Sequence, residues 1–289
     1  MKLRRSTLIA FWAVVAMGSS ALLQAQRLPL EPLHDTGQGV TGAFEGWFKN
    51  QDGSFSLLFG YYNRNQKEDL EIPLGPNNRI DPGGPDQGQP THFQPGRQWG
   101  LFTVTVPADF GTNKLTWTLI TNGQTTAIPG SLNPLWEISA FHEPTTGNTP
   151  PVIRFAGNSS VQGPRPISTA LSATVANPLT LTVSVSDDAK MPLIGSTGMD
   201  RPKTPPVTVT WSKFRGPGVV TFANAKPAVE LANGEAATGG VSGSATTSAT
   251  FSEPGEYVLL VVANDWSGIG GHGYQCCWTN AQVKVSVKP

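Results

Sequence analysis

Residues Val207 to Trp211 read Val-Thr-Val-Thr-Trp, and residues Glu253 to Asp265 read Glu-Pro-Gly-Glu-Tyr-Val-Leu-Leu-Val-Val-Ala-Asn-Asp. In the first segment the apolar side chains alternate with threonines, a period of two that puts them on one face of a β-strand. Residues 179–186 and 283–288 repeat this alternation with Leu or Val against Thr, Ser or Lys. Three segments that agree on one buried face predict a β-sandwich in the C-terminal half.

Residues 211–222, 249–257 and 263–265 resemble bacterial PKD-type domains of the immunoglobulin-like superfamily, and the resemblance covers roughly residues 150–289. Tyr257 follows Pro254-Gly255, where a tyrosine corner closes the turn into a strand of such sandwiches. The resemblance implies a secreted, non-catalytic module that serves as a spacer or as an interaction or carbohydrate-associated domain.

The N-terminal half is also predicted to be all-β. Strands are expected near residues 42–49, 54–62, 69–73, 99–106, 114–121, 124–128 and 135–141, which are rich in aromatic or β-branched residues. Asp52-Gly53 and Asn122-Gly123 are typical of tight hairpin turns. Residues 143–151 are rich in proline and small polar residues, which predicts a linker. We therefore expect two β-sandwich-like domains in tandem, 35–142 and 152–289, the second immunoglobulin-like and PKD-type.

The first residues predict export. Lys2, Arg4 and Arg5 precede an apolar run from residue 8 to residue 23, and Leu23-Gln24-Ala25 ends on a small residue, after which we place cleavage. This order is typical of a secretory signal peptide, here residues 1–25. Arg4-Arg5 leaves twin-arginine export open beside the general route. We expect a periplasmic or extracellular protein with no membrane span after cleavage.

The composition argues against nucleic acid as a partner. Charged residues make up 14% of the chain, against roughly 25% in ordinary soluble domains. Cleavage after Ala25 removes three basic residues, which leaves 17 basic against 20 acidic residues and a net charge of −3. Binding of a polyanion needs a basic surface, and no cluster of Lys or Arg follows Arg27.

Two loops of the C-terminal half are expected to meet near the linker. In an immunoglobulin-like order, residues 187–206 and 265–280 lie at the pole where the domain begins. Asp187, Asp188 and Asp265 can supply oxygen ligands to calcium there. The alternative is that these side chains accept hydrogen bonds within their own turns, as Asx residues commonly do. His272 and Trp278 of the second loop are further candidates for a binding site.

Cys276 and Cys277 are the two cysteines of the chain. Across a trans peptide their Cα atoms would lie about 3.8 Å apart, below the usual range of roughly 4.4–6.8 Å for a disulfide. We expect either a vicinal disulfide that rigidifies the loop or two packed thiols. A soft-metal site with His272 is the third possibility, but a structural zinc site normally has four ligands.

The strand from Tyr257 to Ala263 carries apolar residues on both faces. If Tyr257 points inward, Val258, Leu260 and Val262 point out of the sandwich. Such a stripe marks a contact surface for a partner, or it is covered by a loop or by the first domain. Both alternatives stay open from the sequence.

Residues 74–98 separate two predicted strands without periodicity, and loops of this length are usually functional or disordered. They supply polar side chains for a sugar or peptide site, next to Trp99. The alternative is a proline-fixed cover that protects a sheet edge. The candidate binding residues here are Arg79, Asp81, His92, Arg97 and Trp99.

The sequence favours an exported, non-catalytic protein that binds a protein or glycan partner or takes part in assembly. No GxSxG, HExxH or phosphate-binding loop is present in it. One alternative is a secreted carbohydrate-active enzyme with its site in residues 74–98 and Asp81 and Asp86 as paired acids. Another is an accessory subunit of an envelope complex. Calcium is the one cofactor under consideration.

Overall fold

The computed structural model describes residues 34–156, 160–190, 205–232, 240–269 and 276–289, with the side chains of 166–168 left aside. Residues 34–289 form one compact unit. The predicted signal peptide and His272 lie outside the described residues. No helix in the described ranges is long and apolar enough to cross a membrane.

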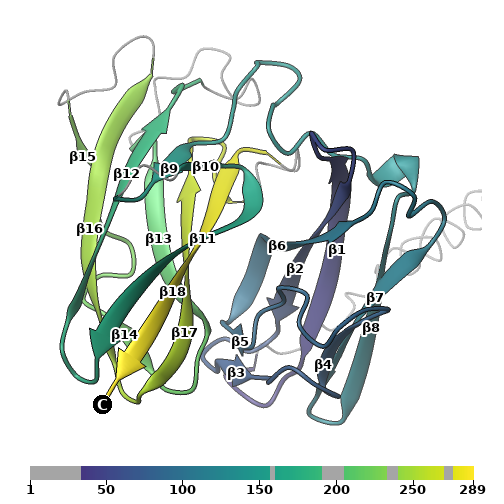
Figure 1. The fold of residues 1–289 in the computed structure, drawn as a ribbon, viewed down its shortest axis with the longest axis horizontal. Coiled ribbons are helices and arrows are strands. Elements are labelled where there is room, and N and C mark those ends of the chain that lie inside the picture. Colours follow the sequence, from purple (N-terminus) through teal and green to yellow (C-terminus); the bar gives the residue numbers. More distant parts are fainter. Residues whose placement is uncertain (1–33, 157–159, 191–204, 233–239, 270–275) are drawn as a thin grey trace, which may run out of the picture. The chain divides into compact units, whose positions relative to one another are not determined.

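The N-terminal half consists of strands joined by turns (Figure 1). The sheets are β1-β2-β6, β4-β7-β8 and the short pair β3-β5, and all their pairings are antiparallel. The strands are β1 (Val40–Lys49), β2 (Phe55–Asn63), β3 (Leu70–Glu71), β4 (Asn78–Asp81), β5 (His92–Phe93), β6 (Gly96–Val106), β7 (Lys114–Thr121) and β8 (Gln124–Ser131).

Aromatic rings join the two larger N-terminal sheets. Trp117 of β7 is fully buried, and its ring centroid lies 5.1 Å from that of Phe102 of β6 and 6.1 Å from that of Phe59 of β2. The indole nitrogen of Trp117 donates a hydrogen bond of 3.0 Å to Oδ1 of Asn78. The buried polar group is thereby satisfied, as a packed core requires. These contacts build a sandwich-like core in this half.

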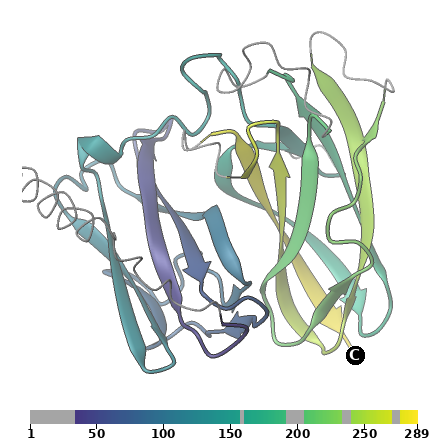
Figure 2. The same cartoon turned by 180° about the vertical axis from the view of Figure 1, so that it is seen from behind.

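The C-terminal half forms two larger sheets, seen from behind in Figure 2. One sheet has the order β10-β9-β12-β16-β14, with β15 also paired to β16, and the other has the order β11-β18-β17-β13. The β11–β18 pair is parallel and the remaining pairs are antiparallel. The strands are β9 (Val152–Arg154), β10 (Ser160–Gln162), β11 (Pro164–Thr174), β12 (Leu179–Asp187), β13 (Thr208–Arg215), β14 (Val220–Phe222), β15 (Glu230–Leu231), β16 (Val241–Phe251), β17 (Gly255–Asn264) and β18 (Trp278–Lys288).

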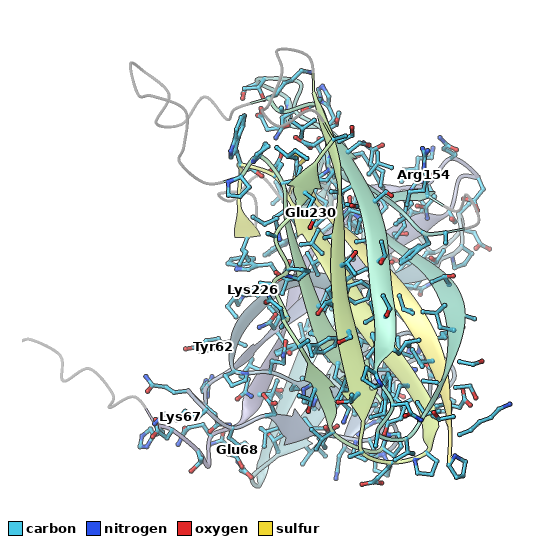
Figure 3. The ribbon with its side chains drawn as sticks, turned by 90° about the vertical axis from the view of Figure 1, so that its left-hand side faces the viewer. Tyr62, Lys67, Glu68, Arg154, Lys226 and Glu230 are labelled. Atoms are coloured by element: carbon cyan, nitrogen blue, oxygen red, sulfur yellow. A yellow bond between two sulfur atoms is a disulfide. The ribbon has the colours of Figure 1, made fainter. Side chains whose placement is uncertain are left out.

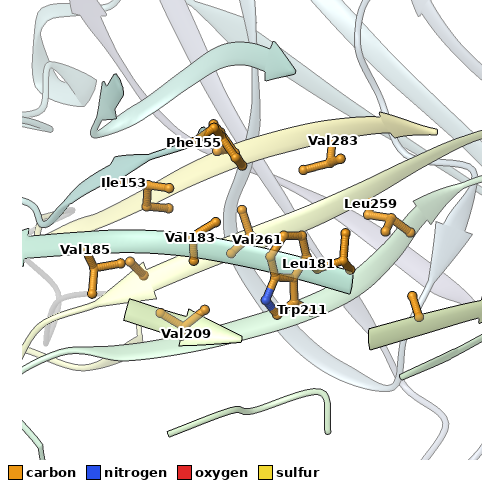
Figure 4. Packing of buried hydrophobic residues seen from close by; sticks show 14 of the residues in the cluster. Ile153, Phe155, Leu181, Val183, Val185, Val209, Trp211, Leu259, Val261 and Val283 are labelled. Atoms are coloured by element: carbon orange, nitrogen blue, oxygen red, sulfur yellow. The ribbon is translucent and has the colours of Figure 1, made fainter. Parts of the chain in front are cut away.

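Trp211 stands in the core between these sheets. The predicted inward residues are buried there, and Figure 4 shows the indole of Trp211 among Leu181, Val209 and Val261. Tyr257 closes the turn before β17, because its hydroxyl donates to the carbonyl of Glu253 at 2.9 Å. The expected alternation and the expected role of Tyr257 are both confirmed. The fold is all-β.

The structure corrects two expectations in the N-terminal half. Residues 135–141 do not form a strand, because a short 3₁₀ helix, η2 (Pro134–Trp136), begins there and Leu135 is 90% exposed. Pro134 has no N–H to give to a sheet ladder, and Asn133 caps the helix by accepting from the N–H of Leu135 at 3.0 Å. Residues 74–98 are not a plain loop, since β4 and β5 lie within them and pair with β7 and β3.

The outer stripe of β17 packs against the N-terminal half. Leu260 is 2% exposed and belongs to the same apolar cluster as Leu101 and Phe102, and Val258 and Val262 pack against that cluster. The structure therefore buries this stripe inside the protein. This is the alternative in which the first domain covers it. Arg215 of β13 adds a two-pronged ion pair with Asp86 at 2.8 and 2.9 Å.

We predict that Leu260→Ala destabilises the protein strongly. Removing a buried leucine side chain typically costs about 2–5 kcal/mol in the free energy of unfolding. Leu135→Ala is the matched control, because this side chain is exposed and such substitutions usually stay within about 0.5 kcal/mol. Urea denaturation of both variants measures the difference. Equal stability of the two would show that the contact between the halves contributes nothing.

Candidate functional site

A cavity of about 270 Å³ opens where β6 of the N-terminal half meets β13, β17 and β18 of the C-terminal half. Its walls combine aromatic and aliphatic side chains with amide, hydroxyl and two cationic side chains. The apolar wall residues are Trp99, Leu101, Trp211, Ala225, Leu260, Val262, Ile269 and Trp278. A concave, mainly apolar site with a few polar groups is the usual form of a ligand pocket.

Trp99 stands at this cavity with 37% of its surface exposed, and Arg97 holds it there. The Arg97 guanidinium carbon lies 4.0 Å from the centroid of the indole ring. The same guanidinium donates to Oε1 of Glu45 at 2.5 Å and to the carbonyls of Tyr61 and Gln98 at 3.0 and 2.7 Å. Because Arg97 is fixed by these bonds, the stacked indole is held in a set orientation.

Glu45 offsets the charge of Arg97, on which the Trp99 indole is stacked. Its side chain is almost fully buried, and burial raises the pKa of Glu45, an effect that pairing with Arg97 and the N–H of Gly100 only partly offsets. The pair therefore presents little net charge to the cavity. The Arg97 guanidinium and the Trp99 indole that stacks on it both line the cavity.

A bulge in β6 aims Trp99 at the cavity. Phe59 of β2 pairs with Phe102, but Tyr61 pairs with Gln98, so extra residues are inserted on β6. A bulge of this kind bends the strand and redirects a side chain. Gly100 sits in it with a positive φ of 48°, and a Cβ atom at this position would collide with the indole ring of Trp278. Only glycine lets Trp278 lie this close to β6.

A second cavity of about 370 Å³ adjoins the first, and the two share Gln94, Trp211 and Ala225 as lining residues. Charged side chains are prominent in the second cavity. Glu71 accepts from Nδ1 of His92 at 2.8 Å and from Nζ of Lys213 at 2.6 Å. Burial acts to raise the pKa of Glu71, but these hydrogen bonds outweigh it and the pKa is lowered. Asp69 lies 3.6 Å from Nε2 of His92.

The two cavities gather several of the residues singled out in the sequence. Arg97, Trp99, Leu260, Val262 and Trp278 line the first cavity, and His92 lines the second. Sequence reasoning missed Glu71 and Lys213, which are separated by 142 positions. It also missed Asp69 and Lys226, which had no pattern around them that could have identified them.

Arg79, Asp81 and Asp86 lie in neither cavity. Arg79 pairs with Asp81 at 3.0 Å on the surface. Asp86 holds Arg215, and the hydrogen bond from this guanidinium lowers the pKa of Asp86 although burial acts against it. These acids are engaged with arginines that fix residues 74–98 in place.

The three aspartates of the predicted calcium site lie around the linker. Each accepts a hydrogen bond from the N–H two residues ahead, of Ala189, Lys190 and Ser267 respectively. Asp265 also accepts from the side chain of Asn148 at 2.6 Å, and Asp188 accepts from Thr149 and pairs with Lys190. The local turns considered in the sequence are therefore present.

Some oxygens at this junction have no partner. Oδ1 of Asp187 and Oδ1 of Asn148 are buried without a hydrogen bond. Burial and the nearby charge of Asp265 raise the pKa of Asp187 to about 8, and burial raises that of Asp265. The described residues contain no group of three or more His, Cys, Asp or Glu side chains placed to hold a metal. The two oxygens without partners, Oδ1 of Asp187 and Oδ1 of Asn148, are of the kind that hard cations take as ligands.

Cys276 and Cys277 lie beside this junction and are joined by a disulfide in the structure. The peptide bond between them is cis, not trans as assumed from the sequence, so their Cα atoms are 3.1 Å apart. Both residues are buried. The N–H of Cys277 donates to the hydroxyl of Ser267 at 3.2 Å, and Ser267 in turn donates to Asp265. The start of β18 is thereby tied to the acidic junction.

No protein-family model and no curated protein matches the chain. A protein of unknown function from Porphyromonas gingivalis W83 is similar at 7% identity and a TM-score of 0.22, covering 86% of this chain and 99% of that one. Domains 4 and 5 of the S-layer protein SbsC are similar at 10% identity and a TM-score of 0.20, covering 87% of this chain and 98% of that one. CfaE, the adhesive subunit of CFA/I fimbria of enterotoxigenic Escherichia coli, is similar at 8% identity and a TM-score of 0.24, covering 91% of this chain and 82% of that one. Scores this low carry no argument, and the PKD-type assignment stays a prediction.

Proposed function

We propose that this chain is an exported, non-catalytic binding protein whose ligand enters the cleft formed by the two adjoining cavities. The observation that carries the proposal is the exposed indole of Trp99, held on the Arg97 guanidinium beside an apolar cavity. Rigid aromatic side chains over concave surfaces are the usual anchors of binding. Exposing one otherwise costs free energy, because indole surface is left in water.

The enzyme alternative has less support. Asp81 and Asp86, the acids it required, are each paired with an arginine outside the cleft. Within the cleft, Glu71 is occupied by His92 and Lys213, which suits a positioning role better than general acid catalysis. These contacts favour binding or assembly over catalysis, and the predicted signal peptide supports a place in the periplasm or outside the cell.

Photocrosslinking tests the proposed cleft. We expect p-benzoylphenylalanine in place of Trp99 to give discrete adducts in the native envelope fraction, identified by mass spectrometry. The same group in place of Trp136, which is 50% exposed in η2 and lines neither cavity, is the matched control. Trp99→Ala should weaken rebinding of the purified partner by about tenfold or more, as for an aromatic hot spot.

Equal adducts from both positions would contradict the cleft proposal. Turnover of a glycan panel by the mature protein, lost on Asp81→Ala, would establish the enzyme alternative in its place.

We propose that the disulfide between Cys276 and Cys277 forms on export, because disulfides persist in oxidising compartments. Thiol titration of the denatured protein, purified without reductant from its native host, should find no free thiols, and reduction should release two. Two free thiols before reduction would contradict the bridge.

We propose that calcium is held at the linker junction by Asp187, Asp265 and the amide oxygen of Asn148. The support is the pair of buried carboxylates, for which no cationic partner is found in the described part of the chain. A bound cation would favour the ionised form of Asp187, whose pKa burial and the charge of Asp265 raise to about 8, and would give the unpaired oxygens of Asp187 and Asn148 a partner. The bound cation would then hold the linker to the segments that carry Asp187 and Asp265.

Calcium should therefore raise the melting temperature. Binding at 100 times the dissociation constant adds about 2.7 kcal/mol, which for a chain of this size corresponds to roughly 5–10 °C. Asp187→Asn should abolish the shift, and Asp109→Asn, an exposed acid of the other half, should retain it. Differential scanning calorimetry with calcium, magnesium or chelator makes the measurement. An unchanged shift in Asp187→Asn would place the calcium elsewhere.

A further inference from the structure

The two cavities of the cleft differ in charge. In the second cavity Asp69, Glu71 and Glu253 face one ammonium group, that of Lys213. With His92 neutral these groups sum to −2, and with His92 protonated they sum to −1. Lys213 is already bonded to Glu71, and Asp69 lies beside His92, so with His92 neutral the remaining negative charge is carried by Asp69 and Glu253. Both of these side chains are exposed.

The first cavity is neither acidic nor strongly basic. The charge of Arg97 is offset by Glu45, which leaves the exposed ammonium of Lys226 at its rim (Figure 3). The wall contains aliphatic side chains, Leu101, Leu260 and Val262, beside its tryptophans. Aliphatic and aromatic walls favour the entry of an apolar side chain, whose surface is thereby removed from water.

The volume of the first cavity, about 270 Å³, is enough for one large side chain. Aromatic side chains supply large buried areas and stack at an offset or edge-on, and Trp99 offers them a fixed ring. The shared wall at Trp211 and Gln94 brings the acidic cavity directly next to this site. A ligand that fills both must change from apolar to cationic over a short length.

We infer that the partner of this cleft is an extended peptide segment that places an aromatic side chain in the first cavity and a neighbouring Lys or Arg side chain in the second. The inference rests on the proposed function and specifies its ligand. The aromatic group packs against Trp99 and Leu260, and the cation pairs with Asp69 and Glu253. Opposite charges across an interface set register and suppress wrong partners, so this pairing fixes the direction in which the segment lies.

Selection from a random dodecapeptide library displayed on phage tests the inference with the intact mature protein. Sequences selected on the wild type should combine an aromatic residue with Lys or Arg a few positions away. Reversing the basic residue of a selected peptide to Glu should weaken its affinity about tenfold by isothermal titration calorimetry. The doubly substituted variant Asp69→Lys/Glu253→Lys should select acidic residues in its place.

A matched variant separates charge from folding. Asp52→Lys/Glu137→Lys reverses two exposed acids of the N-terminal half that line neither cavity, and it should select the same peptides as the wild type. Thermal melting of both variants, compared with the wild type, checks that each is folded.

Three results would overturn the inference: no enrichment of peptides, enrichment without basic residues, or the same sequences selected after charge reversal at Asp69 and Glu253. Binding on a glycan array, lost in Trp99→Ala and without peptide enrichment, would retain the cleft as a binding site and replace the peptide by a sugar. Peptides that bind Trp99→Ala as tightly as wild type would refute the proposed anchor itself.

Discussion

The burial of β17 on both of its faces is the constraint on which the rest of the structure depends. Leu259 and Val261 face the C-terminal core, while Leu260 between them enters the N-terminal cluster. Apolar surface of this extent cannot be left in water without a cost of about 25 cal/mol per Å². The two halves are therefore held by the same strand, and the cleft is the opening left at the margin of that contact, where Leu260 and Val262 still form part of its wall.

Two ion pairs lie at the contact between the halves. Arg215 and Asp86 form a two-pronged pair, and Lys213 reaches Glu71 from the opposite half. Lys213 is mostly buried, so its pairing is less screened than a surface ion pair. Charged residues make up 14% of the chain. Removing one member of either ion pair therefore leaves its partner without a counter-charge. The acidic character of the second cavity follows from this arrangement, because the one lysine of its described lining is bonded to Glu71, which leaves Asp69 and Glu253 without a lysine partner.

Period-two alternation was enough to predict the strands at residues 179–186, 207–212 and 283–288, their buried faces and the outward stripe at Leu260. The content of aromatic and β-branched residues, which predicted the N-terminal strands, failed at residues 135–141, where Leu135 and Trp136 follow a proline and stay exposed. The cleft depends on pairings that no local pattern contains: Glu71 meets Lys213 across 142 positions, and Gly100 meets Trp278 across 178. The cis peptide at Cys276-Cys277 likewise has no marker in the residue order. Sequence supplied candidate residues, and tertiary packing selected among them.

Trp278 links the cleft to the linker junction. It follows Cys277 directly, and the backbone of Cys277 is bonded through Ser267 to Asp265, which also holds Asn148 of the linker. At its other end the indole lies against Gly100, and its N–H donates to the Gly100 carbonyl at 3.4 Å. The bulge that carries Trp99 and the loop that carries the acids are thus braced by one residue. A side chain larger than glycine at position 100 would push Trp278 away, and both the cavity wall and the start of β18 would have to move with it.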